Sequence, residues 1–318
     1  GYTGQDGLIG GSDVSYYKRY NLRANSEHKM WNGLVTIGEH VGFVYKDSRG
    51  MNTGNIYNNN LRGAFSTSPL VPVYGADGNY FSTVGSDWNP NDSNPYGTMM
   101  MNRYNQTKAT SVDANVYVQI EPIKNLKFRT VFAVNYGGSD YRSFTPIYKF
   151  TPQSGNGVTK VNQSDGSGIS LVWTNTLTYD FDIKDHHLSA LIGSETTKYD
   201  GSYTSSYGVN LTAGFDDWEH AYVANTDMSH TDRKVNGGPY DPSRGQSFFA
   251  RLGWSWKDRY MINATMRADG SSKFAKGHRW GYFPSVSAGW TLTEEDFMKS
   301  TASWLDFLKL RLSWGQVG

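Results

Sequence analysis

The strongest constraint on this sequence is an alternation of apolar and polar side chains with a period of two, repeated in several long segments. Residues 248–257 show it most clearly. Phe248, Ala250, Leu252, Trp254 and Trp256 occupy one set of alternate positions, while the other set includes Arg251 and Lys257. Alternate residues of an extended strand point to opposite faces of a sheet. The segment is therefore predicted to be a β-strand with one apolar and one polar face.

Four further segments repeat this pattern, at residues 112–121, 126–136, 260–269 and 308–314. In all of them the charged side chains fall on one face only, as Lys127 and Arg129 do between Leu126, Phe128 and Thr130. Strands of soluble proteins usually have about five or six residues. We expect roughly eleven strands of about 10–15 residues, which is typical of an outer-membrane β-barrel with an apolar lipid face.

The connections between these segments alternate in length. Short turns are predicted at Met30–Gly33, Pro122–Asn125, Lys184–Asp185, Lys257–Arg259 and Thr293–Ser303, the last with one helical turn. Long loops rich in Gly, Asn, Ser, Asp and Tyr are predicted at 47–107, 139–167 and 201–244, with a shorter one at 270–281. In outer-membrane barrels the short turns are periplasmic and the long loops extracellular. We therefore expect the turns at one end of the sheet and the loops at the other.

Composition is compatible with such a barrel and excludes several other classes. Hydrophobic residues make up 37% of the chain, and no apolar run approaches the roughly 18 residues of a membrane-spanning helix. A barrel strand needs apolar residues only at alternate positions, so a mean hydropathy of -0.59 does not exclude one. The net charge of +1 gives no reason to expect nucleic acid as a partner, and the absence of cysteine excludes disulfides and thiol chemistry.

Aromatic residues bracket one of the short turns. Trp254, Trp256 and Tyr260 lie on the apolar face on either side of residues 257–259. Membrane barrels carry rings of aromatic side chains at both membrane interfaces. The cluster predicts such a girdle, and the alternative is an ordinary core cluster in a β-sandwich.

No arrangement of residues predicts an enzyme, a cofactor site or a metal site. The adjacent acids at 216–217 and 294–296 are interpreted as solvated surface, and His186-His187 lacks the spacing of metal ligands. Asp87, Asn89 and Asn91 begin like a calcium-binding loop, but Asp92 stands where that loop requires glycine.

Binding is the more plausible chemistry. Six aromatic residues of the long loops lie beside Asn and Asp and are the candidate ligand-binding residues: Tyr74, Tyr80, Trp88, Trp218, Tyr222 and Tyr240. Aromatic rings stack on the apolar faces of sugars, while amides and carboxylates bond to hydroxyl groups. The alternative is that these rings pack the loops together. Arg251, Arg267 and Arg311 on the polar face are expected to bond across the lumen or to a plug rather than to a ligand.

Particular residues then resemble the SusC/RagA family of TonB-dependent transporters. The resemblance is carried by Asp269–Phe274, Arg279–Ser285, Gly289-Trp290, Glu294–Phe297 and Leu308–Arg311. Upstream, Tyr20–Asn25, Ser68–Leu70 with Pro72–Tyr74, and Asn125–Arg129 fit as well. These matches follow in order along most of the chain and are weakest in the long loops.

The resemblance implies a 22-stranded outer-membrane barrel of the Bacteroidetes type, with an N-terminal plug, a SusD-like surface lipoprotein as partner, and import of oligosaccharides or peptides driven through TonB. Residues 1–318 match neither the plug, through which TonB is contacted, nor the last strands. We therefore expect an internal part of the barrel, about half of it, which alone neither closes nor transports. A soluble or surface-attached β-rich protein that binds carbohydrate or acts as an adhesin is the alternative, and the need for detergent distinguishes the two.

Overall fold

The structure is a computed structural model that describes the chain except residues 52, 55–58, 90–91 and 318. Its described part forms one antiparallel sheet of twelve strands and a small two-stranded sheet. The large sheet consists of β1 (Tyr2–Asp6), β2 (Tyr16–Met30), β3 (Val35–Arg49), β4 (Asn105–Ile123), β5 (Leu126–Thr145), β8 (Lys160–Ile183), β9 (His186–Val209), β10 (Lys234–Pro239), β11 (Ser243–Trp256), β12 (Tyr260–Ser271), β13 (Trp280–Thr291) and β14 (Lys309–Gly315). The small sheet pairs β6 (Tyr148–Lys149) with β7 (Gly155–Asn156).

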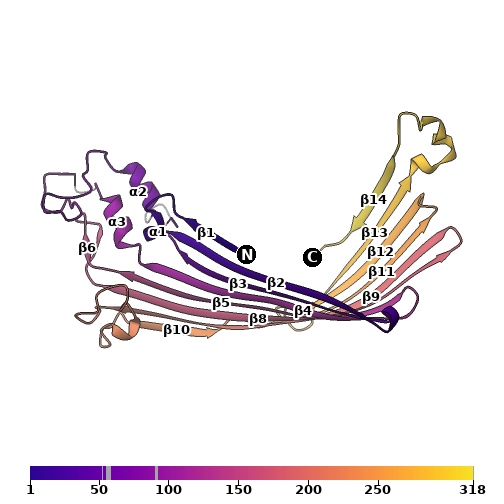
Figure 1. Cartoon of the computed structure of the whole chain (residues 1–318), viewed down its shortest axis with the longest axis horizontal. Helices are drawn as coiled ribbons and strands as arrows, with labels where there is room; N and C mark the ends of the chain where they lie inside the picture. Colours follow the sequence, from indigo (N-terminus) through magenta and orange to yellow (C-terminus); the bar gives the residue numbers. More distant parts are fainter. Residues whose placement is uncertain (52, 55–58, 90–91, 318) are drawn as a thin grey trace.

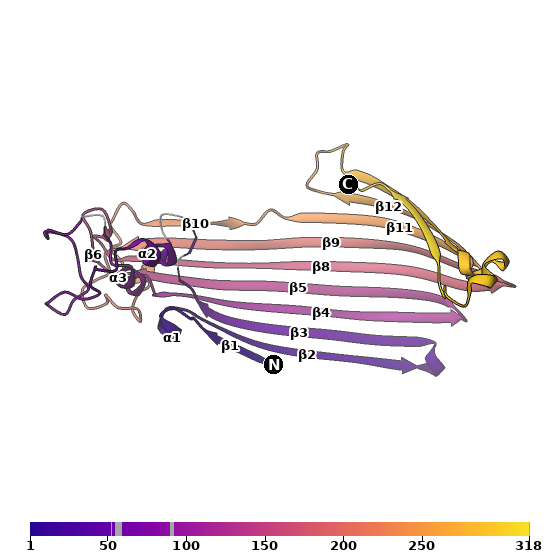
Figure 2. The same ribbon diagram turned by 90° about the horizontal axis from the view of Figure 1, so that it is seen from above.

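The strands follow one another in space in the order of the sequence, so the sheet is a simple meander. Its path runs β1-β2-β3-β4-β5-β8-β9-β11-β12-β13-β14, and β10 pairs with β9 alongside β11. The sheet curves strongly, and β11–β14 rise at an angle to the long strands β2–β9 (Figures 1 and 2). Within the described residues β1 and β14 do not pair with each other, so the sheet is open. The predicted all-β class with an open, curved sheet is confirmed.

Short and long connections are separated as predicted. In an antiparallel meander, alternate connections lie at the same end of the sheet. The turns after β2, β4, β8 and β11 therefore share one end, here called the turn end. The segments after β3, β5, β9 and β12 follow the opposite ends of these strands, here called the loop end. Those after β3, β5 and β9 form the helices and irregular loops on the left of Figure 1, whereas the segment after the shorter β12 lies nearer the middle (Figure 2). The segment after β13 is also at the turn end and contains two 3-10 helices, η3 (Leu292–Glu294) and η4 (Asp296–Thr301).

Two of the predicted long loops contain long stretches of strand, which corrects the sequence-based boundaries. β8 and β9 have 24 residues each, well beyond the 10–15 expected. They extend into the ranges 139–167 and 201–244, and so does β5, while β10 lies wholly inside the second range. The apolar alternation ends where a strand leaves the lipid, but the hydrogen-bonded ladder continues beyond that point. Alternation therefore marks the lipid-facing part of a strand and not its whole length.

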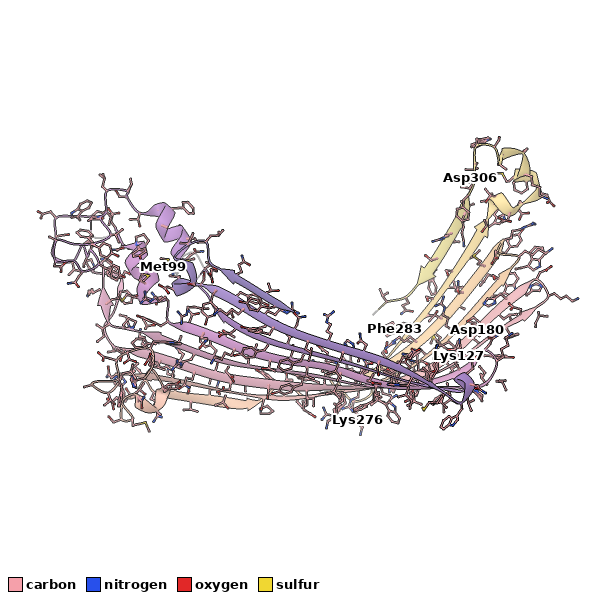
Figure 3. All side chains as sticks on the ribbon, in the orientation of Figure 1. Met99, Lys127, Asp180, Lys276, Phe283 and Asp306 are labelled. Carbon is pink, nitrogen blue, oxygen red and sulfur yellow. The ribbon has the colours of Figure 1, made fainter. Side chains whose placement is uncertain are left out.

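One face of the sheet carries continuous apolar rows. Directly paired residues of neighbouring strands share a face, and one such row joins seven strands through Val35, Ile120, Phe128, Leu177, Ile192, Ala250 and Met266. Its large side chains are exposed, with Ile192 at 58% and nearby Leu252 at 63%. Phe283 pairs with Arg267 and therefore lies on the opposite, polar face. Figure 3 shows Phe283 on the hollow side of the curved sheet. The apolar face is thus the convex, outer one.

The apolar band has the height of a bilayer core. On β5 it runs from Leu126 to Tyr136, a strand length of about 33 Å at ~3.3 Å per residue, and a tilt of ~40° reduces this to roughly the 25 Å expected of a barrel. Glu39 is an exception to the pattern, because it pairs with Val116 on the outer face and accepts a hydrogen bond from Ser26. Beyond Tyr136 both faces of the strands are polar.

Aromatic rings border this band at the turn end, as the sequence predicts. Trp256 and Tyr260 stack with their ring centres 5.7 Å apart, and Tyr260 stacks on Trp290 at 6.3 Å. His186 continues the ladder beside Trp254, whose ring nitrogen donates to it over 3.1 Å. The rings follow the wall across β9, β11, β12 and β13, which is the geometry of a girdle and not that of a compact core.

The loop end is folded on its own small core. Buried Phe144, Val161, Ala221 and Val223 pack together there with Trp218 beside them. Helices α1 (Gly11–Val14), α2 (Asn60–Ser66) and α3 (Pro95–Met101) and the 3-10 turn η2 (Val223–Asn225) also lie at this end. In the described part of the chain no helix is long and apolar enough to cross a membrane.

Candidate ligand site on the inner wall

The inner face is built from aromatic rings that lie flat on glycines. At Gly38 an added Cβ would run into the Tyr117 ring, and at Gly193 it would run into the Phe249 ring. Each ring is in turn covered by an arginine, with the Arg129 guanidinium carbon 3.8 Å from the centre of the Tyr117 ring. Glycine within a strand commonly marks a close approach of this kind.

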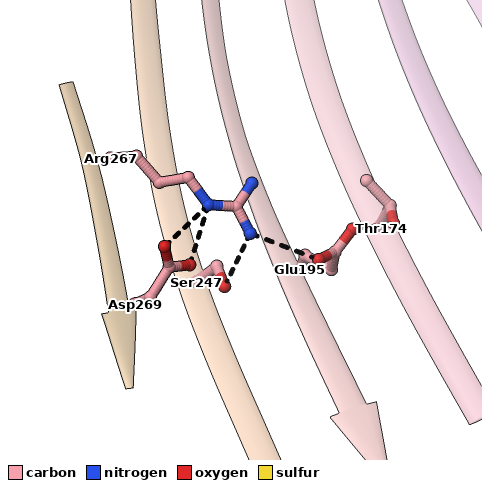
Figure 4. A network of polar contacts seen from close by, with 5 residues as sticks. All are labelled: Thr174, Glu195, Ser247, Arg267 and Asp269. Carbon is pink, nitrogen blue, oxygen red and sulfur yellow. Dashed lines mark hydrogen bonds and ion pairs between the residues drawn. The ribbon is translucent and has the colours of Figure 1, made fainter. Parts of the chain in front are cut away.

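The arginines of this layer are neutralised within the wall. Arg267, 5.5 Å from the centre of the Phe249 ring, donates its Nε to both carboxylate oxygens of Asp269 at 2.8 and 2.9 Å. Its Nη2 reaches Ser247 at 3.1 Å and Glu195 at 3.5 Å, and Glu195 also accepts from Thr174 (Figure 4). Cation and acids are thus paired along the wall of β8, β9, β11 and β12.

The structure shows which groups the arginines of the polar face bond to. Arg267 is bonded to Asp269 of its own strand and to Ser247 and Glu195 of neighbouring strands, so its partners lie within its own wall. Arg251 also bonds locally, donating to Asn263 on the adjacent strand at 3.3 Å. In the stack formed by Gly38, Tyr117 and Arg129, the Tyr117 hydroxyl donates a hydrogen bond to Glu27 at 2.6 Å. These groups stiffen the wall and leave little free charge at this level.

A groove without such pairing opens higher on the same face, toward the loop end. It has a volume of about 550 Å³, and its lining includes Lys46, Asn135, Tyr199, Tyr240 and a series of glycines and serines. Its floor is glycine because the rings lie on it: an added Cβ at Gly168 would meet the Tyr199 hydroxyl. In the same way, one at Gly201 would meet the Tyr240 ring. We call this feature the tyrosine groove.

Tyr240 is placed in the groove by a break between two strands. It follows β10 and precedes β11, and its backbone N–H donates to the Gly201 carbonyl at 2.9 Å. Its ring stacks on Tyr203 with centres 5.3 Å apart and is 39% exposed. The ring thus has one supported face and one accessible face, as a stacking platform requires.

The chemistry of the groove is that of a mostly neutral, preformed binding surface. Tyr199 and Tyr240 offer phenol rings and hydroxyls, Asn135 offers an amide, and Lys46 supplies the cationic group. Few polar groups placed around aromatic surface are characteristic of ligand sites. Groups of this kind can bond to sugar hydroxyls or peptide amides.

The structure does not bring the six candidate aromatic residues together. Tyr74 and Tyr80 stack on each other at 5.5 Å in the 50–104 segment, where Trp88 meets Phe81 edge to face. Trp218 and Tyr222 enclose the Arg142 guanidinium carbon, at 4.0 and 4.2 Å from their ring centres. Tyr240 is the one of the six that lines the tyrosine groove.

Sequence reasoning missed Tyr199, Lys46 and the glycine floor. A signal was present, since Tyr199, Gly201 and Tyr203 alternate in a stretch rich in Gly, Ser and Tyr. That stretch lies at the boundary of the segment predicted to be a loop. The stretch could not be recognised as a strand from its sequence because neither of its faces is apolar.

No metal centre accompanies the groove among the residues that are described, where no three His, Asp or Glu side chains gather. Asn91 of the calcium-like segment lies outside the described residues. Glu295, from the acidic run interpreted as solvated, is instead buried: it accepts from Trp290 at 2.9 Å and from Tyr260, and it pairs with Arg259 at 3.0 Å. This correction arises because the segment after β13 folds back onto the turn-end girdle.

A curved antiparallel sheet with a lipid-type outer face, an aromatic girdle and a polar inner wall defines the wall of an outer-membrane-type β-barrel. No family model matches the chain. Over its whole length, however, it is 28% identical to the TonB-dependent receptor P26 of Formosa agariphila and 26% identical to the TonB-dependent receptor SusC of Bacteroides thetaiotaomicron. The chain spans about 30% of the length of these relatives.

Solved structures agree on the fold. The fold is similar to that of the RagAB peptide importer in its open-open state, with a TM-score of 0.82 at 20% sequence identity. The alignment covers 99% of this chain and 34% of the importer chain. The closed-closed state of RagAB gives a TM-score of 0.81 at 19% sequence identity. The chain is thus similar over its whole length to TonB-dependent receptors that include SusC, and the resemblance seen in the sequence is confirmed. Its relatives are receptors and not enzymes, in agreement with the prediction that the chain has no catalytic role.

Proposed function

We propose that residues 1–318 form part of the barrel wall of an outer-membrane transporter that imports an oligosaccharide or a peptide. The observation that carries the proposal is the two-sided sheet, whose outer face is apolar over a bilayer height and whose inner face is polar. Similarity to TonB-dependent receptors supports energy supplied through TonB and a SusD-like lipoprotein as surface partner. The outer membrane is then the location of the protein.

The tyrosine groove is the proposed contact for the ligand along this wall. It faces the hollow of the sheet and lies toward the loop end, where a ligand from outside arrives first. Tyr240 and Tyr199 present rings to it, Lys46 supplies its cation, and the rest of its named lining is uncharged. We therefore assign it an uncharged portion of the ligand, whereas Trp218 and Tyr222 hold Arg142 and stabilise the loop.

The test is uptake by cells that lack the chromosomal gene and carry the complete gene on a plasmid. Fluorescent oligosaccharides and fluorescent peptides are supplied to cells with and without TonB. Import of one class that requires TonB, reduced about two- to tenfold by Tyr240→Ala as expected for one lost aromatic contact, supports the proposal. The matched control is Tyr74→Ala in the 50–104 segment, which should retain uptake. Import that is equal without TonB contradicts the transporter, and import unchanged by Tyr240→Ala contradicts the groove.

A further inference from the structure

The connection between β12 and β13 is strongly basic. Lys273, Lys276 and Arg279 lie in it, and residues 270–281 contain no Asp or Glu. The connection is short and held to the sheet, because the Ser272 N–H donates to the Arg244 carbonyl and the Arg244 N–H donates to the Ser272 hydroxyl, both at 2.9 Å. Its cations therefore stay close to the end of the sheet.

Further cations adjoin this connection on the outer face. Arg244 pairs with Lys198 across β11 and β9, and both bond to Asp200, at 2.7 and 3.1 Å. We call Lys198, Arg244, Lys273, Lys276 and Arg279 the basic patch. Its five cations against one carboxylate give +4, whereas the formal net charge of the whole chain is +1. The positive charge is thus concentrated at this site.

The basic patch lies just beyond the apolar band. Phe248 and Trp280, with ring centres 6.1 Å apart, stack on the outer face at the loop end of β11 and β13. From Tyr260 in the turn-end girdle to Gly270, which pairs with Trp280, β12 covers about 33 Å of strand, or roughly 25 Å of height at barrel tilt. Lys276 projects beyond the strand layer on the side away from both chain termini (Figure 3). Two aromatic borders therefore enclose the band, and the cations stand directly outside the upper one.

We infer that the basic patch binds the phosphate groups of an anionic glycolipid in the outer leaflet of the membrane. The inference rests on the proposed function, because it requires the band to lie in lipid. Acyl chains would cover exposed Phe248 and Tyr282, at 52% and 58%, while the headgroup phosphates meet Lys273, Lys276 and Arg279. Cations near a membrane surface each contribute to the attraction of anionic lipid.

A lipid accounts for this arrangement better than a soluble anion does. The basic patch is continuous with apolar surface below it, and Phe274 in the connection is 61% exposed. A free phosphate would use the cations and leave these rings in water. Lys198 and Arg244 of the basic patch lie on the outer face by strand register, and Lys276 projects on that side (Figure 3), opposite the tyrosine groove. The transported ligand therefore does not pass these cations.

The test uses protein expressed from its complete gene and purified in detergent. Binding of phosphorylated lipid A is compared with binding of dephosphorylated lipid A and of inorganic phosphate, by native mass spectrometry and by titration. The variant Lys273→Gln/Lys276→Gln/Arg279→Gln should weaken binding of phosphorylated lipid A about fivefold per cation, or roughly 100-fold in all. The matched control removes three cations at the turn end, with Lys124→Gln, Lys184→Gln and Lys257→Gln, and should bind as the wild type does.

If the triple variant folds poorly, binding of phosphorylated lipid A is measured instead with the single substitution Lys276→Glu, which is at an exposed position. Weaker binding in both variants, with import unchanged, supports the inference. Equal binding of dephosphorylated lipid A, tight binding of inorganic phosphate alone, or an equal loss in the turn-end control contradicts it. A protein that needs no detergent contradicts the proposed function itself, so the two failures are distinguishable.

Discussion

At the scale of single residues, the inner wall depends on where side chains are absent. The Tyr117 side chain occupies the space above Gly38, where the three atoms nearest to an added Cβ would be two carbons of its ring and its hydroxyl oxygen. The ring position in turn sets Arg129 and the hydrogen bond to Glu27. A glycine in a strand weakens the strand by itself, and here the cost is offset by close ring packing.

Gly38→Ala should therefore destabilise the barrel by about 1–3 kcal/mol, the range for overpacking. Removing the obstacle with Tyr117→Ala should make the two changes clearly non-additive. Gly42→Ala is the matched control on the same strand, because a Cβ there meets only ordinary contacts at 3.6 Å or more. Thermal unfolding in detergent is measured for the wild type and the four variants. Equal losses for Gly38→Ala and Gly42→Ala would disprove the role of the ring.

Leu252 tests the assignment of the outer face. It is 63% exposed within the apolar band, so Leu252→Arg should cost about 2–4 kcal/mol in lipid and reduce assembly. Ser189→Arg is a control at nearly the same depth on the inner face, where it would face Asp180. Assembly is read from the shift in gel mobility on heating. Equal assembly of the two variants would refute the assignment.

At the scale of elements, the segment after β13 is attached to the wall by one buried carboxylate. Glu295 has a side chain only 12% exposed and bonds to Arg259, Tyr260 and Trp290. The hydrogen bonds from Tyr260 and Trp290, with the charge of Arg259, hold the pKa of Glu295 below its usual 4.5. The ionised form is thus the one that the fold stabilises.

The sign of the pH dependence follows from this lowered pKa. The contribution of Glu295 is complete above pH 4.5 and is lost as the pH falls through the lower pKa of the folded state. Acidification should therefore release the segment and change the fluorescence of nearby Trp290. Glu295→Gln should remove that acid transition, whereas Glu294→Gln, at the exposed neighbouring position, should keep it. An acid transition that persists in Glu295→Gln would contradict the assignment.

Strand boundaries were the least predictable feature of the elements. Leu126–Tyr136 could be recognised because lipid requires apolar residues on one face, and the short turns could be recognised beside such segments. The upper halves of β8 and β9 carry polar residues on both faces, such as Ser202, Tyr203 and Thr204, so their sequence resembles a loop. The backbone hydrogen-bonded ladder extends the strands there without an apolar face, so the apolar alternation used to recognise strands is missing.

The candidate site was less predictable than the fold for a related reason. Tyr240 was identified by its residue type, but its partners Tyr199 and Lys46 come from strands distant in sequence. Cross-strand register brings them together, and single-sequence pattern does not specify which distant strands are neighbours. Trp218 and Tyr222 had the same composition around them and instead enclose Arg142.

At the scale of the whole molecule, one sheet separates two environments. The sheet is curved (Figure 1), with apolar rows and girdle rings on its convex side and paired charges with the tyrosine groove on its concave side. A membrane barrel needs this separation, because lipid-facing and lumen-facing residues alternate along every strand. Residues 1–318 contain no cysteine, so a cysteine introduced at any of these positions is unique within this part of the protein.

The measurement that tests this account most directly is a cysteine scan of β11 in the complete protein in lipid bilayers. Each residue from Phe248 to Trp256 is replaced in turn, spin-labelled, and examined for collision with oxygen, which enters lipid, and with a water-soluble nickel complex. Oxygen accessibility should peak at 248, 250, 252, 254 and 256, and nickel accessibility should peak at the positions between. A profile with no period of two, or one with the odd-numbered positions in lipid, would contradict the assignment of this sheet as a barrel wall with its apolar face outward.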